Sequence, residues 1–131
     1  MQENKKYVSV FDGVRNALMD ILDIDADQIT PETYVIRELG AESIDLLELA
    51  VTLNAVFNVP IQHDDILLLR LRSFLREAEE EGLDSAAYIA AKLPFLPLER
   101  IREILLDLDS GPAIKVSDLI SYIQWRHRIT A

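Results

Sequence analysis

The sequence predicts an all-α protein, a bundle of five or six helices, and three observations support this class. Apolar residues recur three and four positions apart in six segments, which is the spacing of one face of a helix. Short stretches of Val and Ile occur, but none alternates at the period of two that a half-buried strand needs. Glycine and proline residues separate the helical segments and therefore mark the turns between them.

The first half of the chain contains two predicted helices and a long loop. The first helix has its apolar residues on one face from Tyr7 to Ile21 and ends between residues 22 and 25. A loop follows over residues 26–39, and the second helix then runs from Ser43 to about Phe57. Pro60 prevents its continuation. The residues of this second helix that share one face, and that we expect to point inward, are Leu46, Leu49, Ala50, Leu53 and Phe57.

The second half of the chain contains the remaining predicted helices. A helix from Asp64 to Glu81 stops at Gly82, a residue typical of helix C-termini. Shorter helices are predicted over residues 86–93 and 101–108, and the last helix begins near Ser117. We expect a single domain over residues 1–131, with an extra helical insertion at about residues 66–110.

Composition and charge exclude several classes of function. The net charge of −10 argues against binding to nucleic acid or anionic lipid, and it fits partners that present basic patches. The chain has no cysteine, so any reactive thiol must come from a cofactor. The two histidines are far apart, and no metal site is expected. We see no secretory signal and no apolar run long enough to span a membrane, so we expect a cytoplasmic protein.

The stretch from Glu38 to Leu49 is the most informative part of the sequence. Ser43 stands at a helix start directly after a glycine-containing loop, where a modifying enzyme could reach its hydroxyl. Three acids around it form a collar that a basic partner could find by electrostatic steering, and a second apolar stripe lies beside them. The residues that we expect to bind partners are therefore Glu42, Ile44, Asp45, Leu47, Glu48 and Val51.

This stretch resembles the acyl carrier protein family, whose hallmark is Leu-Gly-x-Asp-Ser-Leu at the start of the second helix. The sequence here reads Leu39-Gly40-Ala41-Glu42-Ser43-Ile44, and the resemblance covers residues 7–65 and resumes over residues 114–125. It implies that Ser43 is joined through a phosphodiester to 4′-phosphopantetheine, whose thiol carries acyl groups as thioesters. It also implies a monomeric carrier that is not an enzyme. Its partners would be a phosphopantetheinyl transferase (the holo-carrier synthase) and acyl-transferring and acyl-elongating enzymes with basic docking surfaces.

The chain departs from the family pattern in three places. Glu42 stands where the family usually has Asp, an acid that helps to hold Mg²⁺ in the transfer reaction. Residues 52–58 contain no acid, whereas this part of the helix is often strongly acidic in fatty-acid carriers. About fifty leucine-rich residues between Asp65 and Ile114 replace a short third helix.

These departures indicate a specialised, extended member of the family. Our hypothesis is that the insertion enlarges the hydrophobic interior for a long or unusual acyl chain. We expect a role in fatty acid or lipid biosynthesis. The candidate pathway is lipid A (lipopolysaccharide) acylation with long or hydroxylated chains, because the dedicated lipid A carriers are also extended at this point.

Other interpretations stay open at this stage. Carriers of polyketide and peptide synthesis use the same arm, and an unmodified helical adaptor could share the fold. Ser43 could be a simple helix cap, Asp45 and Glu48 could be a solvated face, and Ile44 and Leu47 could be buried if the helix were rotated. No spacing of Ser, His and Asp, and no glycine-rich phosphate loop, supports an enzyme.

Overall fold

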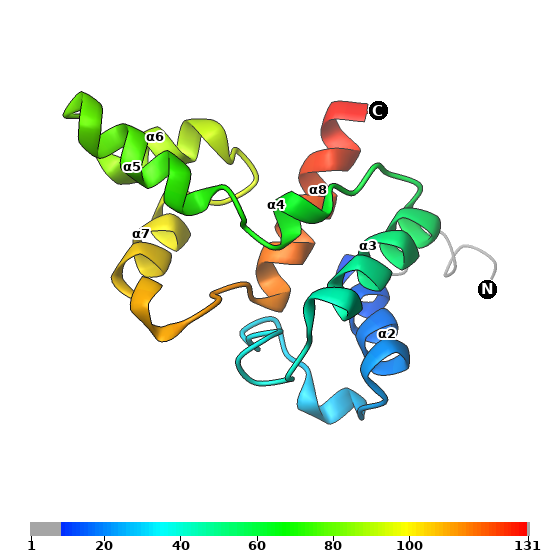
Figure 1. The fold of residues 1–131 in the computed structure, drawn as a ribbon. Coiled ribbons are helices and arrows are strands. Elements are labelled where there is room, and N and C mark those ends of the chain that lie inside the picture. The colour runs from blue at the N-terminus through cyan, green and yellow to red at the C-terminus, as the bar shows by residue number, and fades with distance from the viewer. Residues whose placement is uncertain (1–8, 131) are drawn as a thin grey trace.

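The computed structural model describes residues 9–130, and over this range the protein contains seven α-helices, two short 3₁₀ helices and no β-strand (Figure 1). The predicted all-α class is therefore confirmed. The predicted start of the first helix at Tyr7 lies outside the described residues. The α-helices are α2 (Val10–Leu22), α3 (Ser43–Phe57), α4 (His63–Ile66), α5 (Leu71–Glu81), α6 (Ser85–Lys92), α7 (Leu98–Leu106) and α8 (Val116–Thr130), and the 3₁₀ helices span Ala26–Gln28 and Leu108–Ser110.

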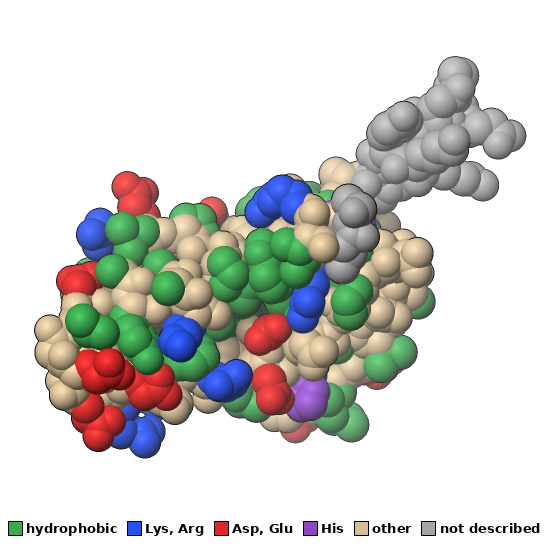
Figure 2. All heavy atoms as spheres, turned by 90° about the horizontal axis from the view of Figure 1, so that it is seen from above, with side chains coloured by type: hydrophobic (Ala, Val, Ile, Leu, Met, Phe, Trp, Pro, Cys, Tyr) green, Lys and Arg blue, Asp and Glu red, His purple; other side chains and the backbone are tan. Residues whose placement is uncertain are grey.

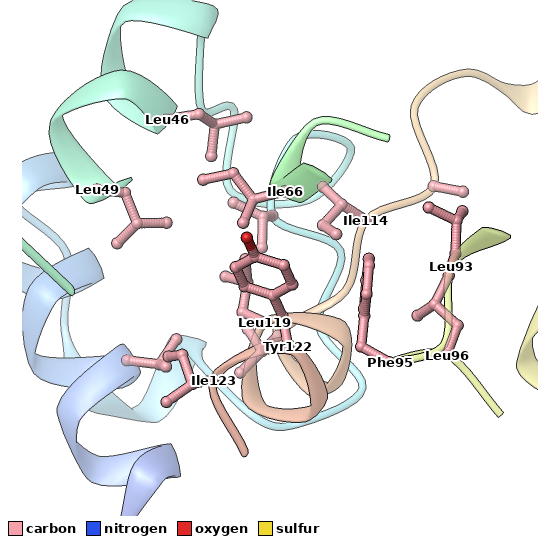
Figure 3. Close-up of a cluster of buried hydrophobic side chains, with 14 of the residues drawn as sticks. Leu46, Leu49, Ile66, Leu93, Phe95, Leu96, Ile114, Leu119, Tyr122 and Ile123 are labelled. Atoms are coloured by element: carbon pink, nitrogen blue, oxygen red, sulfur yellow. The ribbon is translucent and has the colours of Figure 1, made fainter. Parts of the chain in front are cut away.

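Four helices, α2, α3, α4 and α8, form what we call the core bundle. In Figure 1, α4 and α8 lie between α2 and α3 on one side and the remaining helices on the other. The inward face predicted for α3 is confirmed at Leu46, Leu49, Ala50 and Leu53, which are buried, whereas Phe57 at the end of the helix is half-buried. Figure 3 shows Leu46 beside Ile66 of α4, with Tyr122 of α8 below them. The core bundle thus fixes the orientation of α3 and the surface that α3 exposes.

The helices α5, α6 and α7 form what we call the insertion, a second group of helices packed beside the core bundle (Figure 1). Gly82 ends α5 in the left-handed conformation with φ of 68°, and the Asp84 carboxylate caps α6 by accepting from the Ala87 N–H at 2.9 Å. Figure 2 shows acidic side chains gathered at the end of the insertion, where α5 turns into α6. These acidic residues, at about positions 77–84, belong to the insertion and are separate in sequence from the acids around Ser43.

The predicted helix over residues 64–81 is divided in two, so the structure has one α-helix more than the sequence suggested. Leu68 adopts a left-handed conformation with φ of 55°, which costs about 1–2 kcal/mol for a residue with a side chain and cannot continue a helix. The chain therefore leaves α4 at Ile66 and starts α5 at Leu71, and both of these residues are buried. The short segment between them joins the core bundle to the insertion.

Hydrophobic packing joins the insertion to the core bundle. The buried side chains of both parts form one continuous cluster. The ring of Phe95 packs edge-on against Tyr122 with 4.9 Å between centroids (Figure 3). The ring of Trp125 lies 5.8 Å from that of Phe95. The insertion is thus held by a shared core as well as by its two connecting segments.

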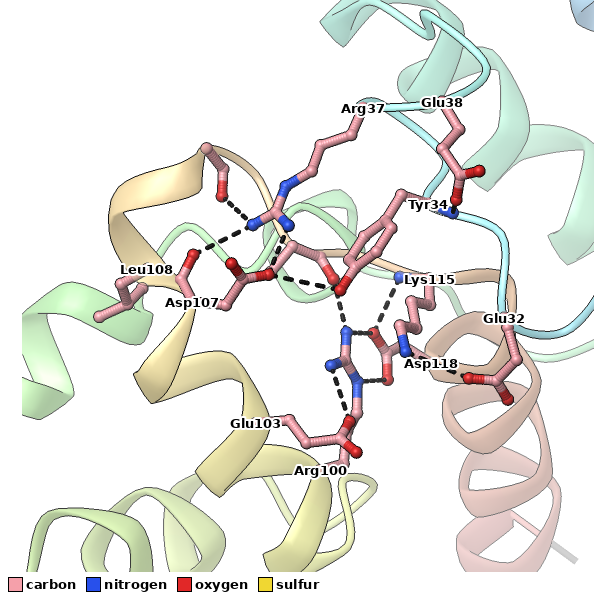
Figure 4. A network of polar contacts seen from close by, with 12 residues as sticks. Glu32, Tyr34, Arg37, Glu38, Arg100, Glu103, Asp107, Leu108, Lys115 and Asp118 are labelled. Atoms are coloured by element: carbon pink, nitrogen blue, oxygen red, sulfur yellow. Dashed lines mark hydrogen bonds and ion pairs between the residues drawn. The ribbon is translucent and has the colours of Figure 1, made fainter.

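A buried ion pair also crosses this boundary. The guanidinium of Arg100 on α7 donates to both carboxylate oxygens of Asp118 on α8, each at 2.9 Å (Figure 4). The Asp118 side chain is 2% exposed and that of Arg100 is 11% exposed. Burial alone would lower the pKa of Arg100, but the hydrogen bonds and negative charges of Asp118 and Glu103 outweigh it and raise this pKa.

Candidate modification site at the start of α3

Ser43 is the first residue of α3, and its side chain is exposed. Gly40, with φ of 73°, turns the preceding loop through a conformation that other residues rarely adopt. Glu42 is extended, and its carbonyl accepts from the Leu46 N–H at 3.1 Å to open the helix. Among the described residues, the Ser43 hydroxyl has no hydrogen-bond partner. The hydroxyl is therefore free to react, because capping α3 does not occupy it.

The three acids of the predicted collar, Glu42, Asp45 and Glu48, differ in burial and in hydrogen bonding. The Asp45 carboxylate accepts from the backbone N–H of Glu42 at 2.8 Å, so Asp45 itself caps the first turn of α3. Asp45 is half-buried, whereas the side chains of Glu42 and Glu48 are exposed. A phosphodiester on Ser43 would lie at the N-terminus of α3, where the helix dipole favours negative charge. The exposed carboxylates of Glu42 and Glu48 could therefore contact basic side chains of a partner.

The second apolar stripe of α3 is on the surface. Ile44 is 66% exposed and Val51 is 71% exposed, while Leu47 is 41% exposed. The alternative in which Ile44 and Leu47 belong to the core is therefore wrong for this structure. Leu47 and Val51 line a shallow groove of about 270 Å³ that α3 shares with Ile61 and His63. We call this the α3 groove. Docking of a partner at this stripe stays a prediction.

The loop before Ser43 is anchored to the insertion by contacts that the sequence did not reveal. Arg37 forms an ion pair with Asp107, and its guanidinium donates to the Gly111 carbonyl at 2.8 Å (Figure 4). The Tyr34 hydroxyl donates to the same Asp107 carboxylate at 3.3 Å. The hydrogen bonds from Arg37 and Ser110 lower the pKa of Asp107. No local spacing could have predicted these contacts, because Arg37 and Asp107 are 70 positions apart.

A second hollow lies where the insertion leaves and rejoins the core bundle. It has a volume of about 330 Å³ and takes its walls from two segments, Leu67 to Arg72 and Leu108 to Ala113. We call it the junction pocket. The apolar run that begins at Ile66 is thus covered only in part, since Leu69 remains 59% exposed at this pocket. The junction pocket and the α3 groove share no lining residue and are two separate hollows.

Neither metal binding nor a membrane span is indicated by the described part of the chain. No three His, Asp or Glu side chains from residues 9–129 come together as a metal site would require. Within the same stretch, every helix is too short or too polar to cross a bilayer.

Comparison with known proteins places this site in a family. A family model described as "Phosphopantetheine attachment site" matches residues 12–74. An acyl carrier protein of Picosynechococcus sp. is 38% identical over 55 residues, which cover 42% of this chain and 68% of that protein. The acyl carrier protein of Nitratidesulfovibrio vulgaris is 38% identical over 58 residues, covering 44% of this chain and 76% of its own length. That of Helicobacter pylori is 35% identical over 54 residues, covering 41% and 69%. No solved structure matches the chain significantly.

Proposed function

Because the chain belongs to the acyl carrier protein family, whose covalent cofactor is 4′-phosphopantetheine, we propose that Ser43 carries this arm. The observation that supports Ser43 best is its position as an exposed, unpartnered hydroxyl at the first residue of α3, inside the matched residues 12–74. The thiol at the end of such an arm carries an acyl group as a thioester. The protein's own residues then present the arm, anchor the loop before it and offer a surface to partner enzymes.

We place partner docking on the exposed face of α3. The acids Glu42, Asp45 and Glu48 give this face negative charge, and the apolar stripe beside them supplies contact area. A phosphopantetheinyl transferase and acyl-transferring or acyl-elongating enzymes with basic docking surfaces would fit it. The core bundle leaves three large apolar side chains exposed on this face, and a docked partner would cover them. They are Ile44, Leu47 and Val51.

We further propose a specialised role, in fatty acid or lipid biosynthesis, for this carrier as a cytoplasmic monomer. The support is the insertion, because most of α5 and all of α6 and α7 lie beyond the residues that the family model matches. Acylation of lipid A with long or hydroxylated chains is the candidate pathway, and carriers of polyketide or peptide synthesis are the alternative. The mass of the thioester carried in the native host distinguishes these cargoes.

The test of the proposed site is modification followed by intact-mass measurement. The full chain is co-expressed with a phosphopantetheinyl transferase, and we expect a mass gain equal to one 4′-phosphopantetheine group. Ser43→Ala should lose this gain. Ser73→Ala is the matched control, because Ser73 is also an exposed helical serine within the matched residues. No gain at all would support the unmodified helical adaptor instead. A gain that survives Ser43→Ala would show that the arm is attached to another residue, and either outcome would overturn the proposed site.

A further inference from the structure

We propose that the junction pocket receives the distal part of a long acyl chain carried on the Ser43 arm. This inference rests on the proposed function, and it assigns the insertion a direct part in holding cargo. It concerns a site separate from the exposed face of α3, because the pocket lies between the two segments by which the insertion leaves and rejoins the core bundle.

The walls of the junction pocket suit an aliphatic ligand. Three consecutive leucines, Leu67 to Leu69, contribute to one wall, and Leu108, Pro112 and Ala113 contribute to the other. Leu67 and Leu68 are only half-buried, so part of their apolar surface remains in contact with solvent. The volume of about 330 Å³ falls in the range of small-molecule pockets, and the lining is mainly apolar. Filling it would remove from water the leucine surface that the fold leaves uncovered.

The backbone of the first wall is held in an unusual conformation. Leu68 has φ of 55°, and this left-handed residue ends α4 and turns the chain toward α5. A regular helix through this point would have distributed the leucines around its axis. Local strain of this kind persists only where the surrounding structure fixes it, and it is frequent at ligand sites. The break therefore gives the pocket a wall that a continuous helix would not form.

The two walls are tied to one another and to the loop that precedes the attachment site. The Arg72 guanidinium donates to the Leu108 carbonyl at 3.1 Å and so links one wall to the other. Arg37 donates to the carbonyl of Gly111, a residue of the second wall. Arg37 is six positions before Ser43. The residue that bears the arm is thus connected to the rim of the pocket by a short, anchored stretch of chain.

The α3 groove is the competing location for the chain. It is smaller, at about 270 Å³, and its lining includes the polar side chains of Asn54 and His63, as the lining of the junction pocket includes Arg72. Its other lining residues include Leu47 and Val51, which face the surface that we assign to partner enzymes. A chain in the junction pocket would leave that surface free. A long chain should therefore fill the junction pocket, whereas a two-carbon acetyl group is too small to fill its volume of about 330 Å³.

The test compares amide NMR spectra of the full chain loaded with two different cargoes. A phosphopantetheinyl transferase transfers acetyl- or palmitoyl-phosphopantetheine from the corresponding coenzyme A thioester, and intact mass confirms the loading. We expect the palmitoyl-minus-acetyl shift differences to be largest at Leu67–Leu71 and Leu108–Ala113. Differences confined to the α3 groove, or none, would overturn this inference alone. Failure to load either arm would overturn the proposed function as well.

A pair of variants separates a specific effect from a general one. Leu69→Asp introduces a charge into the pocket at a residue that is 59% exposed, so the fold should tolerate it, and circular dichroism checks this. Leu83→Asp makes the same change at a leucine that is 49% exposed and is not part of the pocket. We expect Leu69→Asp to abolish the shift differences at the pocket, and Leu83→Asp to keep them. Equal behaviour of the two variants would overturn the inference.

Discussion

Breaking the buried ion pair between Arg100 and Asp118, which links α7 to α8, should strongly destabilise the protein, and Arg100→Met tests this. The substitution keeps most of the aliphatic side chain but removes the charge and the donors. It leaves the carboxylate of Asp118, which is 2% exposed, without its partner on α7. The Lys115 N–H still donates to one carboxylate oxygen at 2.9 Å, so the loss is only partly compensated.

The expected cost follows from the burial of the pair. Breaking a buried ion pair by removing one partner costs about 3–5 kcal/mol, and the remaining Lys115 contact favours the lower end, about 3 kcal/mol. The side chain of Arg15, which pairs with Asp12 at 3.2 Å, is 30% exposed. Arg15→Met should therefore cost less than about 1 kcal/mol and is the matched control. For a chain of this length, a loss of about 3 kcal/mol lowers the unfolding midpoint by roughly 10 °C.

The assay is urea unfolding followed by far-ultraviolet circular dichroism, with the free energy of unfolding obtained by linear extrapolation. The double variant Arg100→Met with Asp118→Leu should recover most of the loss, because it removes the stranded buried charge. A free energy of unfolding for Arg100→Met that equals that of Arg15→Met would contradict this prediction. So would a double variant that is less stable than Arg100→Met alone.

Two further predictions concern packing and pH. Gly13→Ala should lower the free energy of unfolding by about 1–2 kcal/mol, because the new Cβ would overlap the ring of Phe57. In a Phe57→Leu background the same change should stabilise α2 by up to about 1 kcal/mol, because the overlap is relieved and alanine favours a helix. Urea unfolding of the unchanged protein, the two single variants and the double variant tests both expectations. The hydrogen bond from the Tyr88 hydroxyl to the Glu77 carboxylate, at 2.7 Å, raises the pKa of Tyr88 to about 12. Because the protonated form is favoured in the folded state, this contact stabilises fully below the unfolded pKa of about 10 and is lost as the pH rises through about 12. Phenolate absorbance should show Tyr88 ionising at a lower pH in Glu77→Ala than in the unchanged protein, although desolvation and the charge of Glu81 still raise its pKa. An unchanged titration would count against the contact.

The helices and the orientation of α3 could be predicted from the sequence because both depend on local periodicity. The apolar spacing from Leu46 to Leu53 matches the face that the core bundle buries, and Leu47, Glu48 and Val51 on the other face are exposed. Ser43 was expected at a helix start because Gly40 precedes it, and it is the first residue of α3. Local pattern was sufficient in these places because neighbouring residues decide the conformation.

The arrangement of the insertion could not be predicted, because it depends on contacts between distant residues. Nothing near Leu68 signals a break, since leucine is a good helix former and only the packing of α4 and α5 requires its left-handed conformation. The pairing of Arg37 with Asp107 likewise depends on how the insertion folds back toward the loop before Ser43. The junction pocket depends on both features, because the break at Leu68 shapes one wall and Arg37 contacts Gly111 in the other.

The central claim is that Ser43 bears the 4′-phosphopantetheine arm, and the most direct measurement is peptide mapping of the protein purified from its native host. Proteolysis and tandem mass spectrometry locate the modification on a single residue. We expect to find the arm on the peptide containing Ser43 and on no other serine-containing peptide. An unmodified Ser43 in protein from growing cells, or an arm on any other residue, would contradict it.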